Sequence, residues 1–337
     1  MAVTMLDIAK RLDLSAATVS RVLSGKGAGF ISSVTRDRVM HAAKEMGYRP
    51  NRVAQGLVSG KTRVIALWVR NPDAPYYAGI LRSVQELATD HGYEMILSGY
   101  RDEGEEVLPD SIAEHDLRSW PVDGVIAADC PLRVQRYRDA NPNTPVVAIS
   151  TDEGLEVDSV TFDQVAGIQE AMQHLFEIGC RKPVHMSALF AVPQVARERK
   201  RVFEEACAKA GIAGKIVTAK DESRAAAREQ VKKLWHEGGG DALFCINDDV
   251  AIGAYRGLRD LGVKVGEEVA LVGVDNIPDA AYIDPDLTSV RQPVEEMCRR
   301  AWDLLNRRWE EPTADIVHES LKPTLVTRDS TKRFKRK

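Results

Sequence analysis

Hydroxyl and guanidinium side chains gather between residues 15 and 21, where the chain runs Ser-Ala-Ala-Thr-Val-Ser-Arg. A guanidinium can donate two hydrogen bonds to the N7 and O6 atoms of one guanine, the commonest specific contact to DNA. Hydroxyl groups and the amides at a helix N-terminus suit phosphate oxygens. The pattern predicts that Arg21 contacts a base and that Thr18 and Ser20 contact phosphates. The alternative is that these side chains only face solvent.

Two short helices joined by a tight turn must position these side chains. Thr4 can cap the first helix, with Asp7 in its electropositive first turn. Apolar residues follow at helical spacing, at Ile8, Ala9 and Leu12. After a turn at residues 13–14, Ser15 can cap a second helix whose inward side chains are Val19, Val22 and Leu23. With a third helix from about Ser33 to Met46, the pattern predicts a helix-turn-helix head. An ordinary three-helix bundle is the alternative.

Charge favours the DNA-binding interpretation. Residues 1–63 hold 11 Lys and Arg against 4 Asp and Glu, a formal charge of +7, whereas the whole chain carries −4 and the remainder therefore −11. A basic head on an acidic body indicates phosphate contact confined to one end. A second basic cluster, residues 332–337, is interpreted as a solvated tail, with a weak DNA contact as the alternative.

Residues 51–57 predict a helix too short to persist alone. Asn51 can cap it, and Gly56 lowers its helix propensity by about 1 kcal/mol relative to Ala. Nucleation of so short a helix is unfavourable in water, so the segment must fold against something else. Leu57 packing onto the following domain is one alternative.

From residue 64 onward, short apolar runs alternate with amphipathic helices. Strands are expected at residues 64–69, 93–97, 122–127, 146–149, 160–162, 183–187, 216–218, 242–246 and 269–274. Apolar strands separated by helices indicate parallel sheets covered on both faces. The fold class is therefore α/β, with two doubly wound lobes and a ligand cleft beyond the carboxyl ends of the strands.

Polar and aromatic side chains at the predicted strand ends suggest a ligand. Carboxylates, an amide and a guanidinium beside an aromatic wall suit a sugar or another polyol, because each hydroxyl needs donors and acceptors. Arg70 would also suit an anionic ligand such as a sugar acid or sugar phosphate. Three alternatives stay open: an internal Asp275–Arg199 ion pair, lobe packing by Tyr76 and Tyr77, and a helix cap by Asn247.

Neither catalysis nor membrane insertion is indicated. The seven histidines form no metal-binding motif, and no cofactor or metal is expected. The five cysteines are isolated, as in reduced cytoplasmic proteins. Residue 1 begins no basic-then-apolar leader, and no apolar run is long enough to span a bilayer.

The chain resembles the lactose-repressor/galactose-repressor (LacI/GalR) family along nearly its whole length. The head motifs are Val3-Thr4-x-x-Asp7-Ile8-Ala9, Ser15-x-x-Thr18-Val19-Ser20-Arg21-Val22-Leu23, Thr35-Arg36 and Tyr48-x-Pro50-Asn51-x-Val53-Ala54. The body motifs are Asn247-Asp248, Gly262-x-x-Val265-Gly266, Val272-Gly273-x-Asp275 and Leu287-Thr288-x-Val290-x-Gln292-Pro293.

The resemblance implies how DNA is contacted. Ala16 and Ala17 occupy positions that contact bases in the family, and two hinge helices pair in the minor groove, where Leu57 is inserted between base steps. The complete predicted set is Thr4, Ser15, Ala16, Ala17, Thr18, Ser20, Arg21, Ser32, Thr35, Asn51, Arg52, Ala54 and Leu57. The expected partners are an operator in double-stranded DNA and a second copy of the chain.

The resemblance also implies the effector site and the domain limits. Tyr76 and Tyr77 stand where the family stacks its ligand. The stretch Ala188-Leu189-Phe190 replaces the usual Gly-Pro of the family, so Phe190 is expected to shape the pocket. The predicted effector-binding residues are Arg70, Tyr76, Tyr77, Asp163, Phe190, Arg199, Asn247, Asp248 and Asp275. The expected domains are a head at residues 1–47, a hinge linker at 48–63, and a tail at 331–337. Between linker and tail, an N-lobe at 64–163 and 293–322 and a C-lobe at 164–292 and 323–330 form a periplasmic-binding-protein-like body.

The sequence is compatible with three functions. The favoured hypothesis is a cytoplasmic, effector-responsive transcriptional regulator, a repressor rather than an enzyme, that acts as a homodimer. A periplasmic sugar-binding protein would need secretion, which the absent leader disfavours. A sugar-converting enzyme would need a catalytic cluster, and the sequence suggests none.

Overall fold

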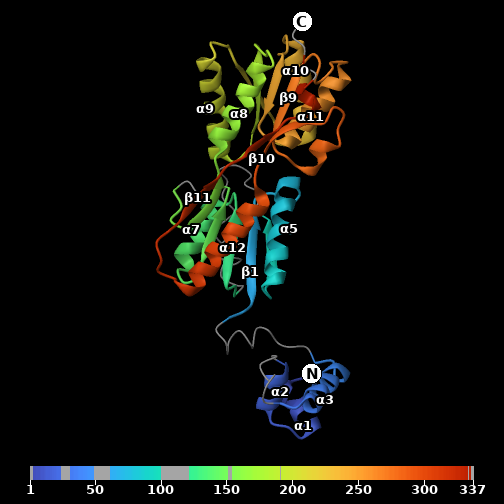
Figure 1. The fold of residues 1–337 in the computed structure, drawn as a ribbon, viewed down its shortest axis with the longest axis vertical. Helices are drawn as coiled ribbons and strands as arrows, with labels where there is room; N and C mark the ends of the chain where they lie inside the picture. The colour runs from blue at the N-terminus through green and yellow to red at the C-terminus, as the bar shows by residue number, and fades with distance from the viewer. Residues whose placement is uncertain are drawn as a thin grey trace. The chain divides into compact units, whose positions relative to one another are not determined.

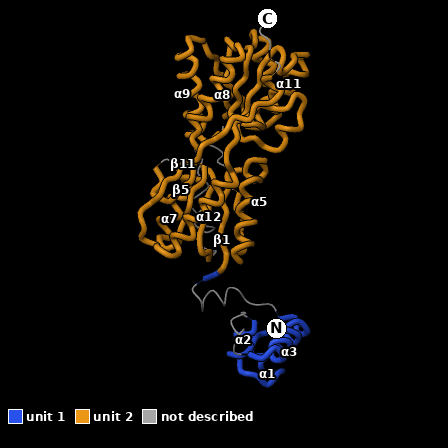
Figure 2. The backbone as a smooth tube through the Cα atoms, viewed as in Figure 1, with its two compact units in different colours: residues 1–62 blue, residues 63–337 orange. Residues whose placement is uncertain are grey.

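The computed structural model describes residues 3–23, 31–48, 61–99, 121–150, 154–189, 191–332 and 334. The chain forms two compact units, Met1–Thr62 and Arg63–Lys337, shown in separate colours in Figure 2. The predicted hinge residues and one predicted effector residue lie outside the described residues: Asn51, Arg52, Ala54, Leu57 and Phe190.

The described residues of the first unit form a head with three helices. Its helices are α1 (Met5–Leu12), α2 (Ala16–Leu23) and α3 (Ser33–Glu45). Ile8, Val19 and Val39 come from different helices and are fully buried against one another. This core confirms the apolar spacing predicted for the head.

Side-chain caps fix where the helices of the head begin. The Thr4 hydroxyl accepts from the Asp7 amide at 3.3 Å, and Asp7 accepts in return from the Thr4 amide at 2.9 Å. Ser15 accepts from the Thr18 amide at 3.1 Å at the start of α2. Such caps satisfy amides that a helix leaves without partners, so local sequence sets the helix boundaries.

The first sheet of the second unit has the strand order β11-β5-β4-β3-β1-β2. Its strands are β1 (Val64–Val69), β2 (Glu94–Gly99), β3 (Gly124–Ala128), β4 (Val146–Ile149), β5 (Asp158–Phe162) and β11 (His318–Leu321). All its described pairings are parallel. We call this half of the unit the N-lobe.

Helices cover both faces of the N-lobe sheet. Alternate side chains of β1 point to opposite faces, as extended strands require. Ile65 and Leu67 pack with helices α5 (Pro75–Asp90) and α12 (Val294–Glu310), whereas Ala66 and Trp68 pack with α7 (Pro131–Ala140). Figure 1 shows α5 and α12 beside the strands of this lobe.

The second sheet has the order β12-β10-β9-β8-β6-β7 and forms the C-lobe. Its strands are β6 (Pro183–Ala188), β7 (Lys215–Ala219), β8 (Ala242–Cys245), β9 (Ala270–Asp275), β10 (Thr288–Arg291) and β12 (Thr324–Val326). Helices α10 (Arg224–His236) and α11 (Asp248–Asp260) cover one face, and α8 (Gln164–Glu177) and α9 (Pro193–Lys209) cover the other. The two lobes confirm the predicted fold class, although β12 pairs with β10 in an antiparallel direction.

The chain passes between the lobes three times in the described residues. The passages lie between β5 and α8, between β10 and α12, and between β11 and β12. Strands β10, β11 and β12 had not been predicted from the sequence. No helix in the described part of the chain has the length and apolar character needed to cross a bilayer.

The predicted tail boundary at residue 331 is corrected by the structure. Helix α13 (Asp329–Lys332) continues the C-lobe, and Thr331 is only 1% exposed. Its hydroxyl lies 2.8 Å from that of Thr288 and 2.8 Å from His174 Nε2. These buried contacts outweigh the solvation expected for a polar, basic segment.

Candidate functional site

A cavity of about 860 Å³ lies between the two lobes. Its N-lobe wall is built from the end of β5 and from segments that follow β1, β3 and β4. Its C-lobe wall is built from the end of β9 and from segments that follow β6, β7, β8 and β10. Carboxyl ends of parallel strands meet at one edge of a sheet, so both sheets direct loops into the same space. The volume is that of a small-molecule site.

Six of the predicted effector residues line this cavity. They are Arg70, Tyr76, Tyr77, Arg199, Asn247 and Asp275. They come from both lobes and are far apart in the sequence, so the fold brings predicted residues from separate segments of the chain to one cavity.

Asp163 and Asp248 lie outside the cavity lining. Asp163 caps α8 and accepts from the Ala166 amide at 2.9 Å. Asp248 is fully buried, and it accepts from the Ile277 amide at 2.9 Å and from the Ser289 hydroxyl at 2.7 Å. Each carboxylate is held by nearby donors, so both have structural roles in this arrangement.

Two tyrosines form the aromatic wall. The ring centroids of Tyr76 and Tyr77 are 5.0 Å apart at an interplanar angle of 69°. The Tyr77 hydroxyl donates to Asp129 Oδ2 at 2.8 Å, and the Tyr76 hydroxyl lies 2.5 Å from the Ser150 hydroxyl. Burial, and next the Asp129 carboxylate, raises the pKa of both tyrosines well above the ordinary value. Both phenols therefore stay protonated and can donate hydrogen bonds.

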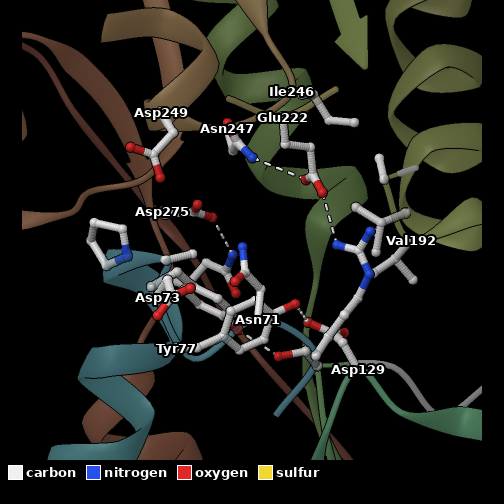
Figure 3. A pocket seen from close by; sticks show the side chains of 18 of the residues that line it. Asn71, Asp73, Tyr77, Asp129, Val192, Glu222, Ile246, Asn247, Asp249 and Asp275 are labelled. Atoms are coloured by element: carbon white, nitrogen blue, oxygen red, sulfur yellow. Dashed lines mark hydrogen bonds and ion pairs between the residues drawn. The ribbon is translucent and has the colours of Figure 1, made fainter. Parts of the chain in front are cut away.

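An ion pair crosses the cavity from one lobe to the other. Arg70, directly after β1, donates from Nη1 to Glu222 Oε2 at 2.8 Å, and Asn247 Nδ2 donates to Glu222 Oε1 at 3.1 Å. Figure 3 shows Glu222 between Asn247 and the guanidinium to which it is paired. Asn247 also caps α11 by accepting from the Val250 amide, as one interpretation of the sequence proposed. Arg70 was expected to suit an anionic ligand, but its guanidinium already forms an ion pair with the Glu222 carboxylate.

Arg199, Asp275 and Gln292 are polar residues on the C-lobe side of the cavity. Arg199 is 4% exposed and donates to the Ile246 carbonyl. Gln292 donates from Nε2 to Asp275 Oδ1 at 2.7 Å. Burial raises the pKa of Asp275 well above its ordinary value, although the Arg199 guanidinium acts in the opposite direction. No direct ion pair joins Arg199 to Asp275 in the structure of these residues.

Several lining residues had not been selected from the sequence. They are Asn71, Asp73, Asp129, Ser150, Phe162, Asp221, Glu222, Arg224, Asp249 and Gln292, among others. Asp129 and Ser150 each follow a strand directly. The rule that ligands bind at the carboxyl ends of strands would have found these two.

The head presents the predicted DNA-contacting side chains at its surface. Ser15, Ala16, Ala17 and Arg21 are exposed on or beside α2, and Thr18 and Ser20 are partly exposed. Thr4 and Ser32 are exposed at the first turns of α1 and α3, and Thr35 is partly exposed. Several hydroxyls lie at helix N-termini, where backbone amides attract anions.

Fold and site together define a class of protein, one with a basic helix-turn-helix head and a two-lobed, ligand-binding body. The model for "Bacterial regulatory proteins, lacI family" matches residues 4–51, and that for "Periplasmic binding protein-like domain" matches residues 172–331. The HTH-type transcriptional regulator DegA of Bacillus subtilis (strain 168) is 31% identical over 346 residues, covering 98% of each chain. The chain therefore belongs to the LacI family of bacterial regulatory proteins.

Solved structures extend the similarity to the whole fold. The lac repressor dimer bound to operator and the anti-inducer ONPF has a TM-score of 0.84 and 25% identity, with 98% of this chain and 99% of that chain covered. The transcriptional regulator CelR in complex with cellobiose has a TM-score of 0.69 and 29% identity, with 97% and 99% covered.

Proposed function

We propose that this protein is a transcriptional repressor that binds operator DNA as a homodimer and responds to a small molecule held between its lobes. The observation that carries the proposal is the combination, in one chain, of an exposed helix-turn-helix surface and a cavity lined by both lobes. The operator-bound lac repressor dimer and the cellobiose complex of CelR support it, since both resemble this chain along nearly its whole length.

On the DNA side, α2 enters the major groove in this proposal. Arg21 then contacts a guanine, and the methyl groups of Ala16 and Ala17 allow close approach to base edges. Hydroxyls at the helix N-termini contact phosphates and fix the orientation of the head. Two heads, related by the symmetry of a dimer, match two half-sites of a palindrome.

The linker couples the head to the body. We place the head at residues 1–47, the linker at 48–63, the N-lobe at 64–163 and 293–322, and the C-lobe at 164–292 and 323–332. Asn51, Arg52, Ala54 and Leu57 are assigned to a hinge helix that orders on the operator. Coupling requires that the ligand bind more tightly to one of the two body conformations, DNA-bound or free.

On the ligand side, the polar groups of the cavity favour a molecule with many hydroxyl groups. Tyr76, Tyr77 and Phe162 provide aromatic surface, and the buried polar group around Asp275 provides hydrogen bonds. We propose that the ligand is bound without turnover. A DNA-binding role supports a cytoplasmic location.

Selection of DNA from a random pool tests the proposal. The full chain should enrich fragments with two inverted half-sites, and footprinting of an enriched fragment should show twofold-symmetric protection. Affinity should fall steeply with salt, since phosphate contacts release counterions. Failure to enrich any symmetric site would overturn the proposed function.

A further inference from the structure

The cavity between the lobes carries more negative than positive side chains. Among the described residues, six carboxylates line it, namely Asp73, Asp129, Asp221, Glu222, Asp249 and Asp275. Three guanidinium groups of the described lining face them, namely Arg70, Arg199 and Arg224. The formal charge of this described lining is therefore −3 when all these groups are ionised.

Two of the three guanidinium groups already contact lining carboxylates. Arg70 is paired with Glu222 at 2.8 Å, and Arg224 Nε donates to Asp249 at 2.7 Å. Arg224 also donates from Nη2 to Asp279 at 2.8 Å. An anionic ligand would have to displace these carboxylates to reach Arg70 or Arg224, whereas Arg199 contacts the Ile246 carbonyl. The excess of carboxylates over guanidinium groups in the described lining therefore disfavours sugar acids and sugar phosphates.

Buried atoms without partners indicate where ligand groups bind. Gln292 is 5% exposed, and its Oε1 has no hydrogen-bond partner in the described part of the chain. In the structure, the Nε2 of this amide donates to Asp275 Oδ1, so Oε1 is the amide atom left without a partner. Asn71 Oδ1 is a second acceptor, and Arg199 Nε a donor, that lack partners among the described residues. Buried polar atoms normally have hydrogen-bond partners. Two of these three atoms are acceptors and one is a donor, so they predict a ligand that offers the cavity more donors than acceptors.

Asp275 and Gln292 Oε1 together form an acceptor pair suited to an ammonium group. An ammonium has three donors and no acceptor. The charged groups that act on Asp275 through space include one guanidinium, Arg199, and two carboxylates, Asp248 and Asp249. Figure 3 shows Asp73, Asp249 and Asp275 on one side of the cavity, away from the Glu222 ion pair.

We propose that the effector is a small polyhydroxylated amine, whose ammonium group binds between the Asp275 carboxylate and Gln292 Oε1 while its hydroxyls reach Asn71 and Arg199. This inference rests on the proposed function, because it assigns a ligand class to the same cavity. The rings of Tyr76 and Tyr77 lie in the same lining and favour a cation near their faces.

Calorimetry on the full chain tests the ligand class with three matched probe sets. Each set contains a hexose, its 2-amino-2-deoxy derivative and its uronate, in the gluco, galacto and manno configurations. At least one amino sugar should bind about tenfold or more tightly than its hexose, and the uronates should not bind. The proposal is overturned if a hexose or a uronate binds as tightly as its amino counterpart, or if no amino sugar binds.

A charge-neutralising variant tests the assigned position. Asp275→Asn keeps an oxygen that accepts from Gln292, and Asn tolerates the positive φ of 113° at this position better than most residues. The variant should bind the amino sugar and its hexose with similar affinity. Asp303→Asn removes an exposed charge on α12 outside the cavity lining. This control variant should still bind the amino sugar more tightly than its hexose. If Asp275→Asn still binds the amino sugar more tightly than its hexose, the ammonium group does not bind at Asp275.

The readouts separate this inference from the proposed function. Calorimetry measures binding alone, and the effect on DNA affinity is measured separately with a selected fragment. An amino sugar that binds without changing DNA affinity would contradict the proposed function but leave the ligand class intact. If a neutral or anionic ligand changes the DNA affinity and no amine binds, the ligand class would be contradicted but the proposed function would stay intact.

Discussion

Arg70 and Glu222 join the two lobes across the cavity through a 2.8 Å contact between Nη1 and Oε2. One residue follows β1 of the N-lobe and the other follows β7 of the C-lobe, 152 residues later in the chain. Their side chains are only 11% and 29% exposed. Because the pair joins one residue of each lobe, a movement of the lobes would change the contact between these two charges in the cavity wall.

Glu222→Gln should destabilise the body. Arg70 would remain buried without its counter-charge, so we expect the free energy of unfolding to fall by about 1–3 kcal/mol. Urea unfolding would measure the change. The matched control is Glu156→Gln, because Glu156 pairs with Arg138 at 3.1 Å but is 78% exposed. Exposed pairs contribute about 0–1 kcal/mol, so similar losses in the two variants would contradict the importance of the Arg70 pair.

Arg21→Ala should relax sequence preference at one position of each half-site. Loss of a bidentate contact to guanine costs about 1–3 kcal/mol in discrimination against other bases. Binding of single-base variants of a selected DNA fragment would measure it. The exposed Lys44 on α3 serves as the control, since Lys44→Ala should leave base preference unchanged. If Arg21→Ala weakens binding to all sequences equally, Arg21 contacts phosphate instead.

Asp248 should make stability depend on pH. Burial raises its pKa from 3.8 to about 7, so the folded state binds this proton more tightly than the unfolded state does. The resulting stability is present below the unfolded pKa and is lost as the pH rises toward about 7. Between pH 4 and about 7, the free energy of unfolding of Asp248→Asn should therefore decline less than that of the wild-type protein.

Urea unfolding at several pH values would measure this difference. Asp303→Asn again removes one exposed charge and serves as the control. Parallel pH profiles for Asp248→Asn and the wild-type protein would show that Asp248 does not bind this proton in the folded state.

Gly273→Ala should be strongly destabilising, because a Cβ at this position would lie 2.1 Å from Asp248 Oδ1. Forcing an atom into this packed site costs about 1–3 kcal/mol. Gly79 on α5 provides a contrast, since its nearest neighbour would be Val294 Cγ1 at 3.9 Å. Gly79→Ala should stabilise the helix by up to about 1 kcal/mol. Thermal unfolding of both variants would distinguish the two sites, and a neutral Gly273→Ala would be inconsistent with the close packing there.

The head was predictable because its signals are local. The Thr4 and Ser15 caps depend on residues three positions away, and the structure has both. Strands β11 and β12 were missed because they lack apolar runs and are partly exposed. They become strands by pairing with β5 and β10, which are distant in the sequence.

The cavity was predictable only in part, for a similar reason. Strand ends identify Arg70 and Asp275, because a buried strand precedes each of them. Glu222 follows a short, partly exposed strand, and its partner is known only once the lobes face each other. Asp163, predicted to bind the effector, lies outside the cavity lining and caps α8, because a carboxylate that follows a strand can also cap the next helix.

The coupling between ligand and DNA is the central claim, and one titration tests it directly. The affinity of the full chain for a selected fragment would be measured by fluorescence anisotropy, with and without a ligand that calorimetry shows to bind. The account predicts a change of about 5–150-fold, which Asp275→Asn should reduce. An affinity that stays constant at saturating ligand would contradict it.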